Sequence, residues 1–197
     1  DAYCGKFSIC DVFYQYKIPF TIMPPHVVHP DTYAFENNLK DFAAVCRVVN
    51  GMKRFTIGII GARTTKFKTV RYDEITLQKY GITCDTYDLS ELFCRVERVK
   101  DNDETVRAKI DHLVRYTDFS RVPADKTAVL AKVSVAIDEM IGEYHLDCIT
   151  LRCWEEMQTV LGIAPCVLLS ELNDRGIVAS CEIDLCSAIN MLSLIHI

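Results

Sequence analysis

The sequence lacks the features of a nucleic-acid-binding or membrane-spanning protein. Its 22 Lys and Arg residues are outnumbered by 27 Asp and Glu residues, which gives a formal net charge of −5, and the positive residues are scattered along the chain. A nucleic-acid surface needs clustered positive charge to displace counterions from phosphates. No apolar run approaches the roughly 20 residues that cross a bilayer. We therefore predict no nucleic-acid partner and no membrane partner.

The ten cysteines also lack a recognisable pattern. The chain has no Cys-x-x-Cys pair and no signal peptide. A zinc site needs closer ligand spacing, and a disulfide scaffold is expected in a smaller, loop-rich chain, so both are weaker alternatives. We predict reduced, mostly buried thiols and a cytoplasmic protein.

The chain has no initiator methionine, and we expect it to be a piece of a longer protein that was cut, processed or sampled. With 197 residues, 50% of them hydrophobic and 25% charged, it has the composition of a soluble globular protein and the length for one good-sized core.

Apolar runs alternate with amphipathic segments along most of the chain. Strands are predicted where the run is continuous or alternating, at 55–61, 82–87, 147–153 and 176–181. Helices are predicted to start at Ser90, at Asn102 or Asp103, and after Pro123, and a short helix capped by Asp73 is predicted to run through Leu77. This order predicts an α/β fold, a doubly wound, mostly parallel sheet with helices on both faces, over residues 53–192.

Residues 1–52 are predicted to be the end of a preceding α/β domain. Residues 18–23 have the pattern of a strand that runs into Pro24 and Pro25. A helix capped by Asp31 and stopped by Gly51 follows.

The predicted strand 55–61 opens into a glycine-containing, basic loop from Gly61 through Arg63 to Tyr72. Such a loop suits close approach of an anionic or polyhydroxyl ligand. It is not a Gly-x-Gly-x-x-Gly loop and lacks the Gly-Lys-Ser/Thr of a phosphate loop, so a nucleotide site is a weak alternative.

Three strand ends are predicted to meet at one crevice, because ligands bind outside the carboxyl ends of the strands in such sheets. They are the Gly61–Arg63 loop, the Cys153–Trp154 corner and the segment 181–184. Glu182 is the candidate catalytic residue there, with a helix-cap carboxylate as the alternative.

Three further residues are candidates for substrate binding. Asp184 is either a helix cap or a support for Glu182. Trp154 either fills core or stacks on the apolar face of a sugar, and Arg63 either contacts the ligand or is a solvated loop residue.

These motifs together resemble the L-fucose/L-arabinose isomerase-like family. The resemblance rests on residues 59–63 with Phe67, on 87–93, on Cys153-Trp154, on 172–177 and on 181–184, in the family's order. It covers most of residues 55–191 and makes this the family's middle domain.

The resemblance implies a metal-dependent aldose-ketose isomerase that works through an enediol, usually with Mn²⁺. It places at Glu182 the family's glutamate, which binds the metal and moves the proton between two sugar carbons. It also implies a small-molecule sugar as substrate, of undetermined identity, and a homo-oligomer for the intact protein.

The family's second acidic ligand and its histidine ligand lie beyond the positions present here. We therefore expect a fragment that is catalytically incomplete by itself. Residues 193–197 differ from the family's continuation and are predicted to be a non-native tail. A non-catalytic sugar-binding or regulatory α/β module is the alternative function.

Overall fold

The computed structural model describes residues 2–195, and these fall into two compact units that divide between Val49 and Asn50. The predicted tail lies partly outside the described residues, since residues 196 and 197 are not described, while residues 193–195 continue the last helix. Each unit is considered by itself.

The first unit consists of two helices joined by an irregular segment. Helix α1 spans Ala2–Gln15 and α2 spans Tyr33–Gly51, and neither buries a residue. The strand predicted at residues 18–23 is wrong, because this segment is irregular and pairs with no strand. The predicted Asp31 cap is also displaced: α2 begins after Thr32, whose carbonyl accepts from the N–H groups of Phe35 and Glu36.

The second unit is built on a four-stranded sheet in which every pairing is parallel. Its strands are β1 (Phe55–Ile60), β2 (Ile82–Tyr87), β3 (Cys148–Leu151) and β4 (Val178–Cys181). Their order is β2-β1-β3-β4, so β2 and β4 lie at the edges of the sheet.

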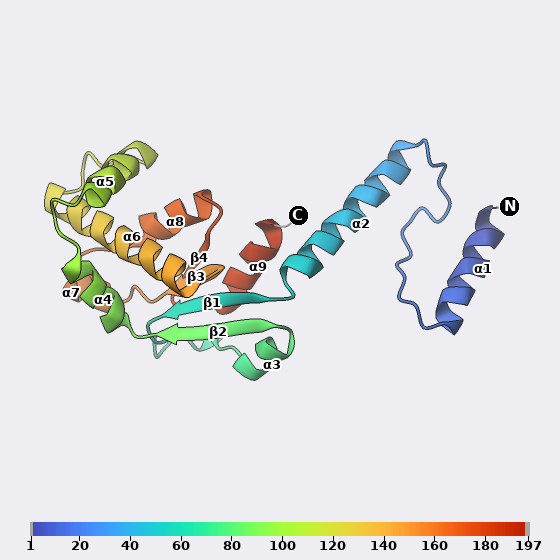
Figure 1. The fold of residues 1–197 in the computed structure, drawn as a ribbon, viewed down its shortest axis with the longest axis horizontal. Helices are drawn as coiled ribbons and strands as arrows, with labels where there is room; N and C mark the ends of the chain where they lie inside the picture. Colours follow the sequence, from blue (N-terminus) through green and yellow to red (C-terminus); the bar gives the residue numbers. More distant parts are fainter. Residues whose placement is uncertain (1, 196–197) are drawn as a thin grey trace. The chain divides into compact units, whose positions relative to one another are not determined.

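Helices cover both faces of this sheet (Figure 1), which confirms the predicted doubly wound α/β fold. Alternate residues of β1 point to opposite faces, and Ile60 joins one apolar core while Ile57 and Ile59 join the other. On the Ile60 side lie α4 (Leu89–Arg98), α5 (Glu104–Tyr116), α6 (Ala124–Tyr144), the short α7 (Glu156–Val160) and α8 (Cys166–Asp174). On the other side lie α3 (Glu74–Lys79) and α9 (Leu185–Ile195). The 3-10 turn η1 (Lys68–Val70) comes before α3 in the chain.

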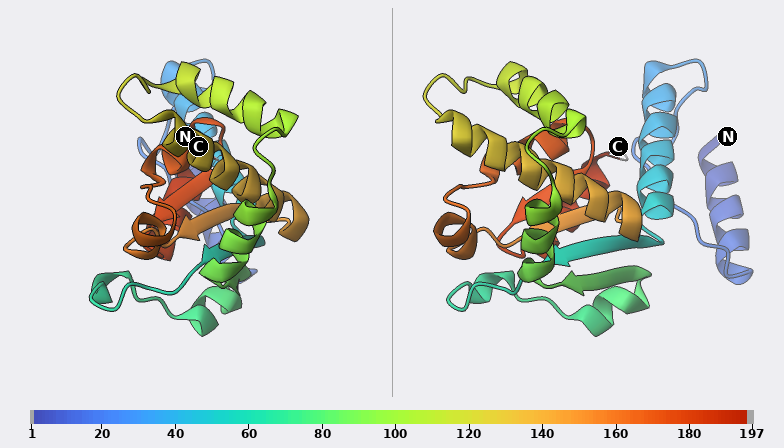
Figure 2. Two further views of the ribbon diagram at one scale, coloured as in Figure 1. Left: turned by 90° about the vertical axis from the view of Figure 1, so that its left-hand side faces the viewer. Right: turned by 60° about the vertical axis from the view of Figure 1, so that its left-hand side comes forward.

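Aspartate side chains begin three of these helices. Asp73, Asp88 and Asp103 each accept a hydrogen bond from a backbone N–H in the first helical turn, which satisfies a donor that the helix leaves free. The predicted cap at Asp73 is confirmed. Figure 2 shows α6, the longest helix, lying across the sheet between α4 and α5 on one side and α8 on the other.

The prediction that the thiols are mostly buried is wrong. All ten cysteines lie within the described residues, but only Cys148 and Cys153 are buried, and six are exposed. The prediction failed because several of these cysteines lie on outward helix faces or in the first unit, whose two helices contain no buried residue. Within residues 2–195, no helix has the length and apolar character needed to cross a membrane.

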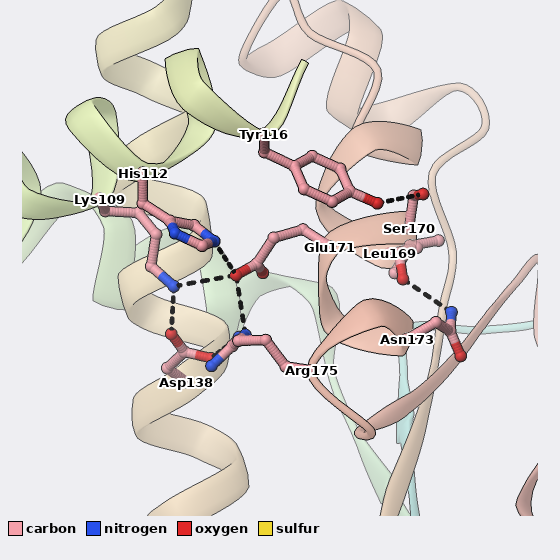
Figure 3. A network of polar contacts seen from close by, with 9 residues as sticks. All are labelled: Lys109, His112, Tyr116, Asp138, Leu169, Ser170, Glu171, Asn173 and Arg175. Atoms are coloured by element: carbon pink, nitrogen blue, oxygen red, sulfur yellow. Dashed lines mark hydrogen bonds and ion pairs between the residues drawn. The ribbon is translucent and has the colours of Figure 1, made fainter. Parts of the chain in front are cut away.

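A charge cluster centred on the buried Glu171 joins α5, α6 and α8 (Figure 3). Glu171, only 1% exposed, places Oε1 2.8 Å from Arg175 Nε, 2.8 Å from His112 Nε2 and 3.8 Å from Lys109 Nζ. Asp138 pairs with both Lys109 and Arg175 at 2.7 Å. Because these ion pairs link three helices on one face of the sheet, the cluster stabilises the packing of the helices against one another.

Candidate functional site

The strand order creates a switch point between β1 and β3. The connection after β1 leads to α3 on one face, whereas the connection after β3 leads to α7 and α8 on the other. Doubly wound sheets bind ligands in the crevice that opens where the two connections diverge. The Gly61–Arg63 loop and the Cys153–Trp154 corner lie on the two sides of this point.

Glu182, just beyond β4, reaches both of those segments. Its Oε1 accepts hydrogen bonds from the backbone N–H groups of Cys153 and Trp154, each at 3.0 Å, and from the Cys153 thiol at 2.8 Å. Its Oε2 accepts from Thr64 Oγ1 at 2.6 Å. The predicted convergence of three strand ends is therefore confirmed, with the carboxylate of Glu182 at the meeting point.

The backbone that presents this carboxylate adopts a rare conformation. Glu182 and Ile183 have φ values of 56° and 65°, in the left-handed region that costs a residue with a β-carbon roughly 1–2 kcal/mol. The turn is held by the Glu182 N–H, which donates to the Leu151 carbonyl at 2.9 Å, and by burial of the Ile183 side chain. Strained conformations of this kind gather at functional sites, where surrounding contacts fix a side chain in place.

A glycine lets the first loop approach the end of β3. Gly61 has a φ of 96°, and a β-carbon there would lie 2.9 Å from Cβ of Arg152. Arg152 in turn donates to the Trp154 carbonyl at 2.8 Å and pairs with Glu156 at 2.6 Å, which braces the Cys153–Trp154 corner.

The surroundings of Glu182 favour its charged form. Burial, with 8% of the residue exposed, raises its pKa, but the hydrogen bonds from Cys153, Thr64 and the two backbone N–H groups outweigh burial and hold the pKa below its usual value. Burial and the neighbouring carboxylate raise the pKa of Cys153 to about 12, so this thiol is a hydrogen-bond donor at neutral pH.

The two carboxylate oxygens of Glu182 have different capacities. Oε1 already accepts three hydrogen bonds, whereas Oε2 accepts one, from Thr64, and keeps a lone pair for a further partner. Oε2 is therefore the atom that can contact a substrate or act as one metal ligand.

The described residues supply only part of the predicted Mn²⁺ site. A divalent ion needs several ligands, and within residues 2–195 no three His, Cys, Asp or Glu side chains lie close enough to hold one. Glu182 fits as a single oxygen ligand. Metal binding there stays a prediction.

Arg63 shapes its own loop. Its Nη1 donates to the carbonyls of Thr64 and Thr65 at 3.1 Å and of Phe67 at 3.2 Å. These contacts curl the loop and so help to position Thr64 against Glu182. The predicted role of Arg63 in substrate binding stays a prediction.

Trp154 lies at the site with part of its ring available. The residue is 47% exposed, and its ring centroid lies 5.6 Å from that of Phe67, in a tilted arrangement. It is therefore not a core-filling residue. An exposed indole is suited to stacking on a sugar, and this role of Trp154 stays a prediction.

Asp184 caps α9. Its Oδ1 accepts from the backbone N–H of Ser187 at 3.0 Å, and its Oδ2 accepts from the Ser187 hydroxyl at 2.7 Å. Of the two roles that its pattern left open, the structure shows the cap. Its contribution to substrate binding stays a prediction.

Sequence reasoning missed Thr64 and the Cys153 thiol as partners of Glu182. Thr64 is one polar residue in a polar loop, so nothing in the local pattern distinguishes it. Cys153 belongs to the corner that was predicted to reach the site, but its pattern gave no sign that the thiol donates a hydrogen bond to Glu182.

Comparison with known proteins gives one family match and several relatives. Residues 1–53 match the model of the fucose/sulfoquinovose isomerase N-terminal domain. The chain is 27% identical over 191 residues to the sulfoquinovose isomerase of Priestia megaterium, covering 96% of this chain and 42% of the relative. It is 29% identical over 170 residues to that of Alkalicoccus urumqiensis, covering 84% of this chain and 37% of the relative. The chain thus spans about two fifths of the length of these curated relatives.

Proposed function

This chain belongs to the fucose isomerase-like family, and we propose that it forms part of an aldose-ketose isomerase. The observation that carries the proposal is the anchored carboxylate of Glu182. It is anionic, nearly buried and fixed at the switch point of the sheet, with Oε2 open to a further partner. The relatives are named for sulfoquinovose, so a sulfonated hexose is the first substrate to try.

Aldose-ketose exchange through an enediol requires a base that removes a proton from one sugar carbon and returns it to the next. Oε2 of Glu182 takes the proton from the carbon beside the carbonyl. The C–H electrons form the carbon-carbon double bond of an enediolate, while the hydroxyl proton on that carbon passes to the carbonyl oxygen. Glu182 then returns its proton to the former carbonyl carbon, and the electrons of the second oxygen form the new carbonyl of the isomeric sugar.

The other residues of the site hold the reacting parts in place. Cys153 and Trp154 bind Oε1 through their N–H groups, which leaves Oε2 directed at the Thr64 side of the crevice. The indole of Trp154 offers a surface for the sugar ring. A bound Mn²⁺ would polarise the carbonyl and hydroxyl oxygens of the sugar, with Glu182 as one of its ligands.

The proposal also says where the other ligands of the metal ion come from. The described residues provide one carboxylate, so we infer that the other metal ligands come from further sequence of the intact protein and that this chain alone is inactive. A cytoplasmic location and a homo-oligomeric intact protein complete the proposal.

The proposal is tested by aldose-ketose exchange in the full-length gene product, with added Mn²⁺ and after chelation. Glu182→Gln should lower the rate by at least about 100-fold, the lower end of what a positioned base contributes. The matched control is Glu97→Gln, at an exposed position on α4, which should keep the wild-type rate.

Two results would contradict this function. Wild-type turnover by Glu182→Gln would remove Glu182 from the chemistry. Sugar binding by a wild-type protein that never exchanges aldose and ketose would favour the alternative, a non-catalytic sugar-binding module.

A further inference from the structure

A second feature lies beside Glu182, at the carboxyl ends of β1 and β2. It is a cavity of about 330 Å³ whose lining includes Gly61, Arg63, Arg71, Tyr72, Thr86 and Ile183. Ile183 belongs to the same left-handed turn as Glu182, and Arg63 to the loop that carries Thr64. The cavity is therefore lined by neighbours of both Glu182 and Thr64 along the chain, and it lies entirely within the second unit.

The side chains that line this cavity carry positive charge, although the chain as a whole is negatively charged. Two arginines and no carboxylate line the cavity, in a protein of formal net charge −5. Three other arginines of the unit, Arg95, Arg152 and Arg175, pair with carboxylates. Within residues 2–195, Arg71 is exposed and forms no ion pair. Its guanidinium is therefore available to a ligand.

Arg63 differs from Arg71 in being held in place. Its Nη1 donates to three loop carbonyls, which fixes the guanidinium at the rim without neutralising its charge. Two guanidinium groups that line one cavity, one held by its loop and one exposed, suit an oxyanion, since each can donate two hydrogen bonds to its oxygens.

The remaining lining also fits a polar, anionic group. Burial and the nearby Cys84 and Glu74 raise the pKa of Tyr72, so its hydroxyl remains a donor at neutral pH. Gly61 has no side chain, so it contributes only its backbone to the cavity wall at the end of β1.

We propose that this cavity binds the anionic substituent of the sugar whose carbonyl end reaches Glu182, with Arg71 and Arg63 as its charge partners. The group is a tetrahedral oxyanion, a sulfonate or a phosphate, attached to a hexose. The inference rests on the proposed isomerase function for the orientation of the sugar, and on the cavity alone for anion binding.

The first test measures anion binding to the 197-residue chain by isothermal titration calorimetry at constant ionic strength. The probes are methanesulfonate and inorganic phosphate. Arg71→Gln should weaken binding of the preferred probe about tenfold, as loss of a hydrogen bond between charged groups predicts. Arg107→Gln, which removes an exposed arginine of α5 outside the cavity, should change it less than about twofold.

The preferred probe identifies the source of the anion. Tighter binding of methanesulfonate assigns the cavity to a sulfonated sugar, and tighter binding of phosphate to a sugar phosphate. Equal weakening by Arg71→Gln and Arg107→Gln, or no binding of either probe, would overturn the inference.

The second test uses turnover by the full-length protein. Arg71→Gln should raise KM for the sulfonated or phosphorylated aldose about tenfold and leave KM for the matching uncharged aldose unchanged. An equal rise for both sugars would indicate a merely structural role and would overturn the inference while leaving the isomerase proposal intact. Arg71-dependent anion binding by a protein without any exchange activity would support the cavity and refute the isomerase.

Discussion

Replacing Glu182 should reveal how much of the site's architecture depends on its carboxylate. In Glu182→Ala, the backbone N–H groups of Cys153 and Trp154 lose their acceptor. An unsatisfied buried donor costs about 1–3 kcal/mol, and water can reach Trp154, so we expect the free energy of unfolding to fall by roughly 3 kcal/mol.

Glu182→Gln keeps most of these contacts. The amide oxygen can still accept from both N–H groups, and the amide nitrogen can donate to the hydroxyl of Thr64. Only the charge is lost, so this variant should lower the free energy of unfolding by about 1 kcal/mol. It separates structure from chemistry, because a nearly native fold is combined with loss of the base.

Urea unfolding followed by tryptophan fluorescence measures both variants. Trp154 is the only tryptophan of the chain, so the signal reports directly on this site. The free energy in water comes from linear extrapolation. Glu97→Ala, at an exposed position on α4, is the control and should stay within about 0.5 kcal/mol of wild type. A cost below about 1 kcal/mol for Glu182→Ala, or equal costs for Ala and Gln, would refute the anchoring role.

Three further predictions concern the framework of the unit. Glu171→Ala should lower the free energy of unfolding by about 1–3 kcal/mol, because Lys109 and Arg175 lose a buried partner and keep only Asp138, whereas Glu171→Leu should cost less; equal costs would contradict this. Asp184→Ala should cost about 1 kcal/mol in thermal unfolding through loss of the α9 cap, and Asp184→Asn should restore most of it, a pattern that a site without a capping role would not give. Burial, with Asp147 and Cys84 nearby, raises the pKa of Cys148 to about 12. Since the folded pKa exceeds the unfolded one, the stability that the protonated thiol provides is present below about pH 8.5 and is lost as pH rises toward 12. Cys148→Ala should flatten this part of the pH-stability curve, and an unchanged slope would count against it.

Much of the second unit could be read from local patterns. The continuously apolar β1, the alternating edge strand β2 and the aspartate at the start of α3 each follow from side-chain period or capping chemistry. In the first unit the same reasoning failed at residues 18–23, because an apolar run becomes a strand only when another strand pairs with it.

The sequence by itself determined that an acid, Glu182, follows a buried strand of a parallel sheet, and therefore that it lies at the ligand-binding edge. Only the tertiary structure decided which groups hold that acid. The thiol of Cys153 and the hydroxyl of Thr64 lie 29 and 118 residues from Glu182 in sequence. They meet it because the order β2-β1-β3-β4 places the ends of β1, β3 and β4 side by side. Contacts between such distant segments are set by strand order, which no local pattern encodes.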